Sequence, residues 1–232
     1  MYYGIDPTII VLIPAIIFTI FAQAKVKSAY AKYSQIPCSS KMTGAQAARM
    51  ILDKNNMSHV PIEVISGTLS DNYDPTKDVM HLSNGIAYSN SIAAVSVAAH
   101  ESGHAIQDGK NFAFLKFRIA MVPIVNLASA ASWPIIIIGI IMAGAGSVFG
   151  NTVLDIGILL FVIVVLFHAV TLPVELDASR RALQQMNALG IITAADESGA
   201  KKMLSAAAMT YVAALASSIA SLIRILLIRG RD

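Results

Sequence analysis

The sequence lacks most of the features that mark secreted disulfide-rich proteins or nucleic-acid-binding proteins. Cys38 is its only cysteine, which excludes an intramolecular disulfide and a cysteine-based zinc site. Charged residues make up 13% of the chain and aromatic residues 7%, and the net charge is only +3. No arginine-rich or aromatic-interleaved stretch is present, so we expect no nucleic-acid partner. No internal repeat or low-complexity segment is visible either.

Apolar residues are what the chain has in excess. Its hydrophobic content is 56% and its mean hydropathy is +0.65, values that an ordinary soluble domain does not reach. Apolar runs cover residues 9–24, 121–146, 153–172 and 204–228. The first three are suited to spanning a lipid bilayer, whereas the last could span it or pack as a buried helix. The short link between the second and third runs predicts an antiparallel hairpin.

The first apolar run can be interpreted as a signal peptide or as a membrane anchor. Residues 22–24 resemble an A-x-A cleavage site, but the residues before the run contain no Lys or Arg. Lys25, Lys27 and Lys32 follow it directly. This charge order favours an uncleaved anchor whose N-terminus lies outside the cell.

The basic residues orient the predicted spans. Nine of them fall on one side of the first three spans, which the positive-inside rule makes cytoplasmic: Lys25, Lys27, Lys32, Lys116, Arg118, Arg180, Arg181, Lys201 and Lys202. Arg224, Arg229 and Arg231 disagree with this orientation if the last run crosses fully, so its topology stays open. Cys38 should be a free cytoplasmic thiol that an impermeant maleimide labels only after permeabilisation.

The main polar segment, residues 25–120, contains elements of ordinary soluble structure. Thr43 and Gln46 form a capping-box pattern that opens a helix ending near Asn55. Short strands are expected at residues 61–65 and 79–82, separated by a turn-rich stretch. The second strand is well placed to pair with an extended peptide substrate, and a simple two-stranded ribbon covering the next helix is an equal alternative.

The pattern H-E-S-G-H, from His100 to His104, carries the chemistry. On a helix the two imidazoles lie one turn apart on one face, so both can reach a single ion. Glu101 can act on a water at that ion as a general base. The small residues between leave room for another element to approach closely. The apolar lead-in, residues 92–99, and a cap at residues 90–91 predict a buried helix.

Two downstream carboxylates can complete the ligand set that a catalytic zinc ion requires. Glu175 follows the third span on the side of the H-E-x-x-H helix, although pairing with a nearby arginine is the simpler alternative. Asp155 lies in a sequence close to the L-D-G motif of site-2 intramembrane proteases, but Ile156 interrupts it. About twenty residues of helix, roughly 30 Å, separate the two carboxylates, so only one can be a ligand. Asp177 should point away from Glu175, and we expect it either to support the metal ligands indirectly or to form an ion pair.

The chain resembles the bacterial YugP-type membrane zinc metallopeptidases, which are distantly similar to HtpX-like proteases. The resemblance rests on H-E-S-G-H-A-I-Q from His100, on L-P-V-E-L-D-A-S-R-R-A from Leu172, and on Tyr73-Asp74-Pro75. It implies a zinc-dependent endopeptidase of the gluzincin kind.

The resemblance also implies a role for each site residue. His100, His104 and Glu175 match the zinc ligands, and Glu101 matches the general base. Gluzincins commonly place an aspartate four residues after the ligand glutamate, where this chain has Ser179. Ser179 and Asp177 are therefore both candidates for supporting the ligands, and Asp177 is the candidate to take over the role of the missing aspartate.

We therefore expect a mainly α, multi-pass protein of the bacterial cell membrane with a small β-strand pair beside the metal-binding helix. The expected segments are an anchor (1–24), a cytoplasmic catalytic segment (25–120), a transmembrane hairpin (121–173), a third-ligand helical segment (174–203) and a last apolar helix (204–232). The expected cofactor is Zn²⁺, and the expected partners are the bilayer and protein or peptide substrates, membrane proteins among them.

The oligomeric state, the natural substrate and the oxyanion-stabilising group stay open. Tyr88, His168 and Tyr211 are candidates for that group. The non-enzymatic alternative is a membrane scaffold stabilised by zinc, which would require four protein ligands rather than three.

Overall fold

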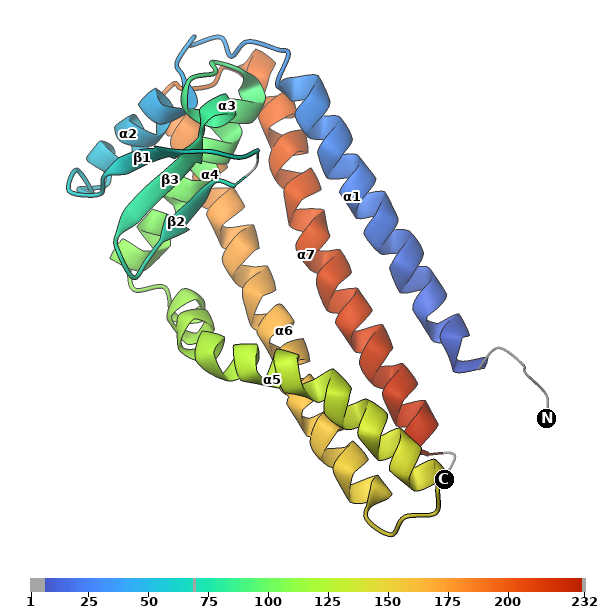
Figure 1. Ribbon diagram of the computed structural model, residues 1–232. Coiled ribbons are helices and arrows are strands. Elements are labelled where there is room, and N and C mark those ends of the chain that lie inside the picture. Colours follow the sequence, from blue (N-terminus) through green and yellow to red (C-terminus); the bar gives the residue numbers. More distant parts are fainter. Residues whose placement is uncertain (1–6, 69, 231–232) are drawn as a thin grey trace. The chain divides into compact units, whose positions relative to one another are not determined.

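The computed structural model describes residues 7–68 and 70–230. In chain order the elements are η1 (Pro7–Leu12), α1 (Ile13–Tyr33), α2 (Gly44–Lys54), β1 (Ile62–Ile65), β2 (Asn72–Asp74), β3 (Val79–Ser83), α3 (Asn84–Ala87), α4 (Ile92–Gly109), α5 (Ala113–Gly144), α6 (Gly150–Ala188) and α7 (Ala194–Arg229) (Figure 1). The predicted mainly α class is confirmed. Arg231, which entered the charge argument, lies outside the described residues.

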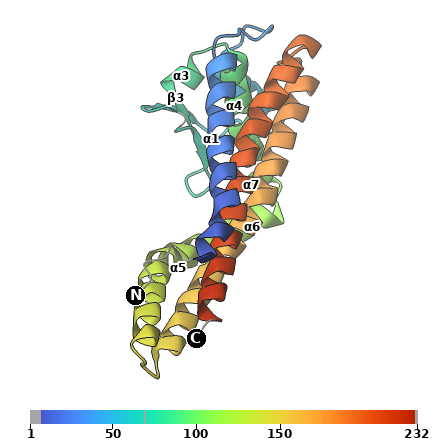
Figure 2. The same cartoon turned by 90° about the vertical axis from the view of Figure 1, so that its right-hand side faces the viewer.

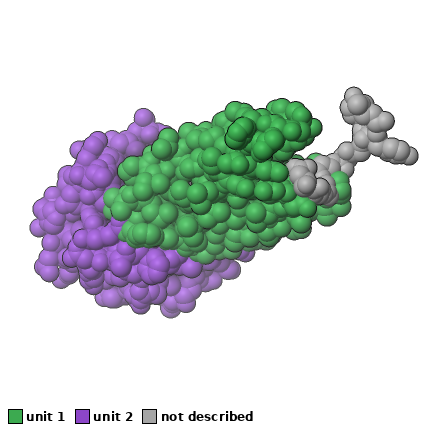
Figure 3. All heavy atoms as spheres, turned by 90° about the horizontal axis from the view of Figure 1, so that it is seen from below, with its two compact units in different colours: residues 1–21, 117–172, 211–232 green, residues 22–116, 173–210 purple. Residues whose placement is uncertain are grey.

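The chain divides into two compact units, coloured separately in Figure 3. Unit 1 comprises Met1–Phe21, Phe117–Leu172 and Tyr211–Asp232, and unit 2 comprises Ala22–Lys116 and Pro173–Thr210. These boundaries fall inside α1, α5, α6 and α7, so each of these helices contributes residues to both units. The five functional segments expected from the sequence stay a prediction.

Among the described residues, four helices are long and apolar enough to cross a membrane. They are Pro7–Tyr33, Ala113–Gly144, Gly150–Ala188 and Ala194–Arg229, with window hydropathies from 2.0 to 2.8. At most 28% of each window is buried, and large side chains such as Leu127 and Leu159 face outward. Helices so apolar on their exposed faces are suited to a lipid solvent rather than to water.

Within unit 1, α5 and α6 form the hairpin that the short link predicts (Figure 1). The two helices approach each other closely at glycines, among them Gly139 and Gly157. A Cβ atom on Gly139 would lie 2.5 Å from the Leu154 nitrogen, and one on Gly157 would lie 2.9 Å from the Ile136 nitrogen. Small residues allow such close packing where water supplies no driving force between helices.

The last apolar run is part of one continuous helix, α7. Within unit 1 an ion pair between Arg229 and Asp155 connects the final turn of α7 to the first turns of α6. Two guanidinium nitrogens take part: Nε donates to Asp155 Oδ1 at 2.9 Å and Nη2 donates to Oδ2 at 3.3 Å. Asp155 therefore acts as the counter-ion of a C-terminal arginine that disagreed with the charge pattern.

The predicted capping box opens α2. The Thr43 backbone N–H donates to Gln46 Oε1 at 2.9 Å, and the Gln46 N–H donates to Thr43 Oγ1 at 3.3 Å. Cys38, just before this helix, is a free cysteine as expected, but it is buried and its thiol donates to the Ile191 carbonyl at 3.2 Å. This burial should slow the reaction of the thiol with a maleimide in the folded protein, and the labelling and the cytoplasmic side of Cys38 stay predictions.

A small sheet in unit 2 has the strand order β1-β3-β2, with β1 parallel and β2 antiparallel to β3. The sequence predicted only β1 and β3. The third strand, β2, falls in the turn-rich stretch, where Tyr73 is buried and the Asp74 carboxylate accepts the N–H of Thr76 to turn the chain toward β3. Because β3 is central and paired on both edges, the idea that it receives a peptide substrate is wrong.

Helix α4 is surrounded by other elements of unit 2 (Figures 1 and 2). Its Ser91 cap accepts the Ala94 N–H at 3.1 Å, and its alanine-rich first half is almost entirely buried. Gly199 of α7 lies against Tyr33 of α1 and Ile92 of α4. The alanines and Gly199 let backbones approach closely, which places the second half of α4 inside the unit.

Candidate metal centre

The second half of α4 carries His100, Glu101 and His104. The two imidazole rings lie edge to face with their centroids 4.8 Å apart. Their side chains are 14% and 12% exposed, so they are sheltered but reachable. The helical spacing therefore places the two rings together as the sequence predicted.

Glu175 comes to these histidines from α6. Its Oε2 lies 3.2 Å from His100 Nε2 and 3.4 Å from His104 Nε2. This approach depends on Gly103, because a Cβ atom there would lie 2.5 Å from the Ala178 carbonyl oxygen. The small residue within the H-E-x-x-H pattern thus admits the backbone of α6.

These three side chains fit a zinc ion. Their donor atoms all lie within 4.8 Å of one another, and they form the one such group found among residues 7–68 and 70–230. Two ligands of a tetrahedral zinc ion at about 2.0–2.2 Å are separated by roughly 3.3 Å. The distances from Glu175 Oε2 to the two imidazole nitrogens match this separation. A His₂Glu set is also the set of catalytic sites that keep a fourth position open.

The remaining imidazole nitrogens have partners of their own. His100 Nδ1 lies 3.2 Å from Ser179 Oγ, and His104 Nδ1 lies 3.1 Å from Gln107 Oε1. Ser179 thus contacts a histidine directly, four residues after Glu175. Asp177 does not take over that position: it binds Arg180 and Arg181, and it reaches the site only through the Gln107 amide.

Glu101 is buried beside the ligand group. Its Oε2 accepts the backbone N–H of Tyr73 at 3.1 Å. Burial raises the pKa of Glu101 to about 7; nearby His100 opposes the shift, while Glu175 and Asp71 add to it. A carboxyl group whose pKa lies near neutrality is suited to taking up a proton and returning it.

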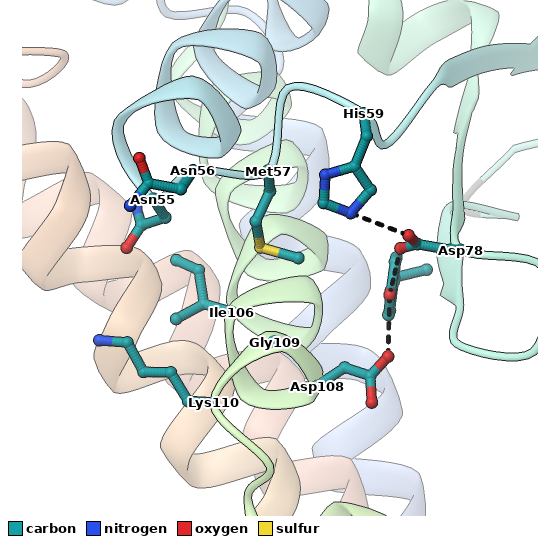
Figure 4. A pocket seen from close by; sticks show the side chains of 10 residues that line it. Asn55, Asn56, Met57, His59, Asp78, Ile106, Asp108, Gly109 and Lys110 are labelled. Carbon is teal, nitrogen blue, oxygen red and sulfur yellow. Dashed lines mark hydrogen bonds and ion pairs between the residues drawn. The ribbon is translucent and has the colours of Figure 1, made fainter.

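A cavity of about 400 Å³ lies at the C-terminal end of α4 (Figure 4). Inside it the Tyr73 hydroxyl lies 2.7 Å from Asp78 Oδ1 and 3.0 Å from Asp108 Oδ2, and His59 pairs with Asp78 at 3.0 Å. Burial, followed by these two carboxylates, raises the pKa of Tyr73 far above its usual value, so the phenol keeps its proton. Tyr73 therefore ties β2 to α4 at two points, through its hydroxyl at Asp108 and through its N–H at Glu101.

Two contributors to the site were missed from the sequence. Gln107 lies one turn beyond His104 on the same face of α4, so helical spacing alone could have indicated it. Tyr73 contributes a backbone N–H, which no side-chain pattern reveals. The only indication of Tyr73 in the sequence was its position in Tyr73-Asp74-Pro75, one of the segments on which the family resemblance rests.

The other candidates belong to other elements of the chain. Asp155 belongs to unit 1 and pairs with Arg229. Tyr88 is 69% exposed at the end of α3, and His168 and Tyr211 are residues of unit 1. A role for any of these last three as the electrophile stays a prediction.

Comparison with known proteins identifies the family. The profile of the family described as "Putative neutral zinc metallopeptidase" matches residues 8–230. The chain belongs to this family. One relative of the chain is the Bacillus subtilis protein named "Putative membrane protease YugP", which is 44% identical over 226 residues, covering 97% of this chain and 98% of the relative. No solved structure matches the chain significantly. The recognised resemblance to YugP-type proteins is thus confirmed.

Proposed function

We propose that this chain is a multi-pass membrane zinc endopeptidase of the gluzincin kind. The observation that carries the proposal is the convergence of His100 Nε2, His104 Nε2 and Glu175 Oε2 beside the buried carboxyl group of Glu101. The donor set suits zinc, and the family is named for a zinc metallopeptidase. The membership of the chain in that family and its four apolar helices support an enzyme that works at a membrane.

In this proposal the residues of the chain divide the work of hydrolysis. His100, His104 and Glu175 would hold a zinc ion, which would supply the Lewis acidity needed to polarise the scissile carbonyl and to make water more acidic. Glu101 takes a proton from the attacking water as the C–O bond forms. It then gives that proton to the amine that leaves when the C–N bond breaks. The Tyr73 N–H holds the Glu101 carboxylate in place between these events.

The edge strand β2 is the element best suited to receive an extended peptide. It pairs with β3 on one edge only. Its Tyr73 N–H is donated to Glu101 rather than to β3, so the outer edge of β2 faces the candidate base. A peptide along this edge would lie beside Glu101; its main-chain hydrogen bonds would use backbone groups of β2 other than the Tyr73 N–H, which Glu101 accepts.

The active site is proposed to face the cytoplasm. The three proposed ligands belong to unit 2. Most of the basic residues that flank the predicted spans belong to the same unit: Lys25, Lys27, Lys32, Lys116, Arg180, Arg181, Lys201 and Lys202. The positive-inside rule assigns them to the cytoplasmic side.

Cysteine labelling tests this orientation. In a Cys38→Ser background, we expect an impermeant maleimide to label Val148→Cys, in the α5–α6 turn, in intact cells. Lys54→Cys, on the exposed side of α2, should be labelled only after permeabilisation. The opposite pattern would reverse the orientation.

Hydrolysis of a casein-like unfolded substrate by the purified full-length protein tests the enzyme itself. We expect Glu101→Gln to abolish cleavage while zinc, measured by mass spectrometry, stays near one ion per chain. Glu197→Gln is the matched control, because that glutamate of α7 pairs with Lys201 and is not one of the proposed site residues. Full activity of Glu101→Gln would refute the proposal. Zinc bound without cleavage by the wild type would favour the scaffold alternative.

A further inference from the structure

Gln107 is a fully buried polar side chain next to the candidate metal centre. It lies on α4 with no exposed surface, and its amide group has three partners. Its Oε1 lies 3.1 Å from His104 Nδ1. Its Nε2 donates to the Val174 carbonyl at 2.7 Å and to Asp177 Oδ2 at 3.0 Å. The amide therefore connects α4 to two positions of α6, Val174 and Asp177, on the turn that carries Glu175.

These partners allow only one orientation of the amide. A main-chain carbonyl and a carboxylate held by Arg180 and Arg181 can only accept hydrogen bonds. Both lie on the nitrogen side of Gln107. A half-turn of the amide would place its oxygen against two other oxygens, so Oε1 must face His104.

The orientation of the amide in turn fixes the tautomer of His104. An amide oxygen only accepts, so Nδ1 of His104 must carry the hydrogen. Nε2 then keeps its lone pair, and it is the nitrogen that lies 3.4 Å from Glu175 Oε2. A neutral imidazole with its lone pair on the metal-facing nitrogen is the form that binds zinc.

His100 is held differently. Its Nδ1 faces the Ser179 hydroxyl, which can either donate or accept. This contact orients the ring but does not decide which nitrogen carries the hydrogen. The hydrogen bonds therefore fix the tautomer of His104 but not that of His100.

We propose that Gln107 is a positioning residue that holds His104 in its zinc-binding tautomer, and that Asp177 acts on His104 through it. The inference rests on the proposed zinc site. It explains how a chain with Ser179 in place of the usual aspartate still has a charged group behind one ligand. Arg180 and Arg181 hold Asp177, Asp177 orients the amide, and the amide orients the imidazole.

Two measurements on the full-length protein in detergent micelles test the inference. The first is zinc affinity, obtained by competition with a chromophoric chelator. We expect Gln107→Leu, which removes the amide at similar volume, to weaken zinc binding about 10- to 100-fold. Gln107→Glu keeps an oxygen acceptor toward His104 but loses the donor, so we expect an intermediate affinity. Gln185→Leu is the matched control: it breaks another inter-helix amide contact, to Asn55 at 3.1 Å, away from both histidines.

The second measurement is independent of zinc. In zinc-free protein labelled with ¹⁵N-histidine, the His104 resonances, assigned with His104→Ala, should show the Nδ1–H tautomer in the wild type and a mixture in Gln107→Leu. Wild-type affinity together with an unchanged tautomer in Gln107→Leu would overturn the inference. A wild-type protein that binds no zinc would instead refute the proposed function, while the tautomer measurement would still decide the role of Gln107.

Discussion

Gly103→Ala is the substitution whose effect the structure defines most sharply. The added Cβ atom would lie 2.5 Å from the Ala178 carbonyl oxygen, 3.1 Å from its carbonyl carbon and 3.2 Å from its Cα. All three are backbone atoms, which cannot move aside as a side-chain end can. To reach an ordinary contact of 3.4 Å, the Ala178 backbone of α6 must retreat from α4 by about 0.9 Å.

This retreat would act directly on the candidate metal centre. Glu175 lies three residues before Ala178 on the face of α6 that meets α4, so it would move with the backbone. Its distances to the two imidazole nitrogens, now 3.2 and 3.4 Å, would grow to about 4 Å. That exceeds the separation of roughly 3.3 Å expected between two ligands of a tetrahedral zinc ion. We therefore expect zinc affinity to fall at least about tenfold.

The effect on stability should be small by comparison. Overpacking costs about 1–3 kcal/mol, whereas replacing a helical glycine by alanine gains up to about 1 kcal/mol. Gly109→Ala on the same helix is the matched control, since its Cβ would meet only the Met57 side-chain end at 3.4 Å. The assay is zinc competition alongside thermal unfolding of both variants. Wild-type zinc affinity in Gly103→Ala would refute the reasoning.

The long helices could be predicted from the sequence, because apolar runs of this length have few alternatives. Their ends could not. The polar continuation of the third span was expected to be a separate segment, yet α6 runs through Pro173 to Ala188. Hydropathy marks where a helix leaves an apolar solvent, and it does not mark where the helix stops. Strand β2 was missed for a related reason: three residues are too few to show an alternating pattern, and Tyr73 is buried only because α4 lies beneath it.

The candidate ligand group could be predicted from the sequence, but the residues that contact it only in part. Spacing places His100 and His104 on one face of a helix, and the resemblance indicated Glu175. Ser179 was a candidate only because it occupies the position, four residues after the glutamate, where gluzincins commonly have an aspartate. The contact of Gln107 with Asp177 depends on the packing of α6 against α4, which neither segment encodes alone.

Three further substitutions separate the parts of the molecule. Glu175→Ala should remove zinc and activity together, because it deletes one of three donors. Asp155→Ala should leave the zinc content near that of the wild type. It removes the carboxylate partner of Arg229, so we expect faster amide hydrogen exchange only in the last turn of α7. Loss of zinc from Asp155→Ala would instead support the intramembrane alternative. Tyr73→Phe removes one hydroxyl that bonds two carboxylates, which is worth about 1–2 kcal/mol because water can reach both acceptors. The hydroxyl touches no ligand, so zinc affinity should hold. Strand β2, however, would keep only its N–H contact with Glu101 and its pairing with β3. We expect amide exchange in β2 to rise about tenfold and cleavage to slow, because the candidate base loses a firmly held donor. Unchanged exchange in β2 would show that the hydroxyl does not anchor the strand to α4, and the link between the cavity and Glu101 would then have to be abandoned.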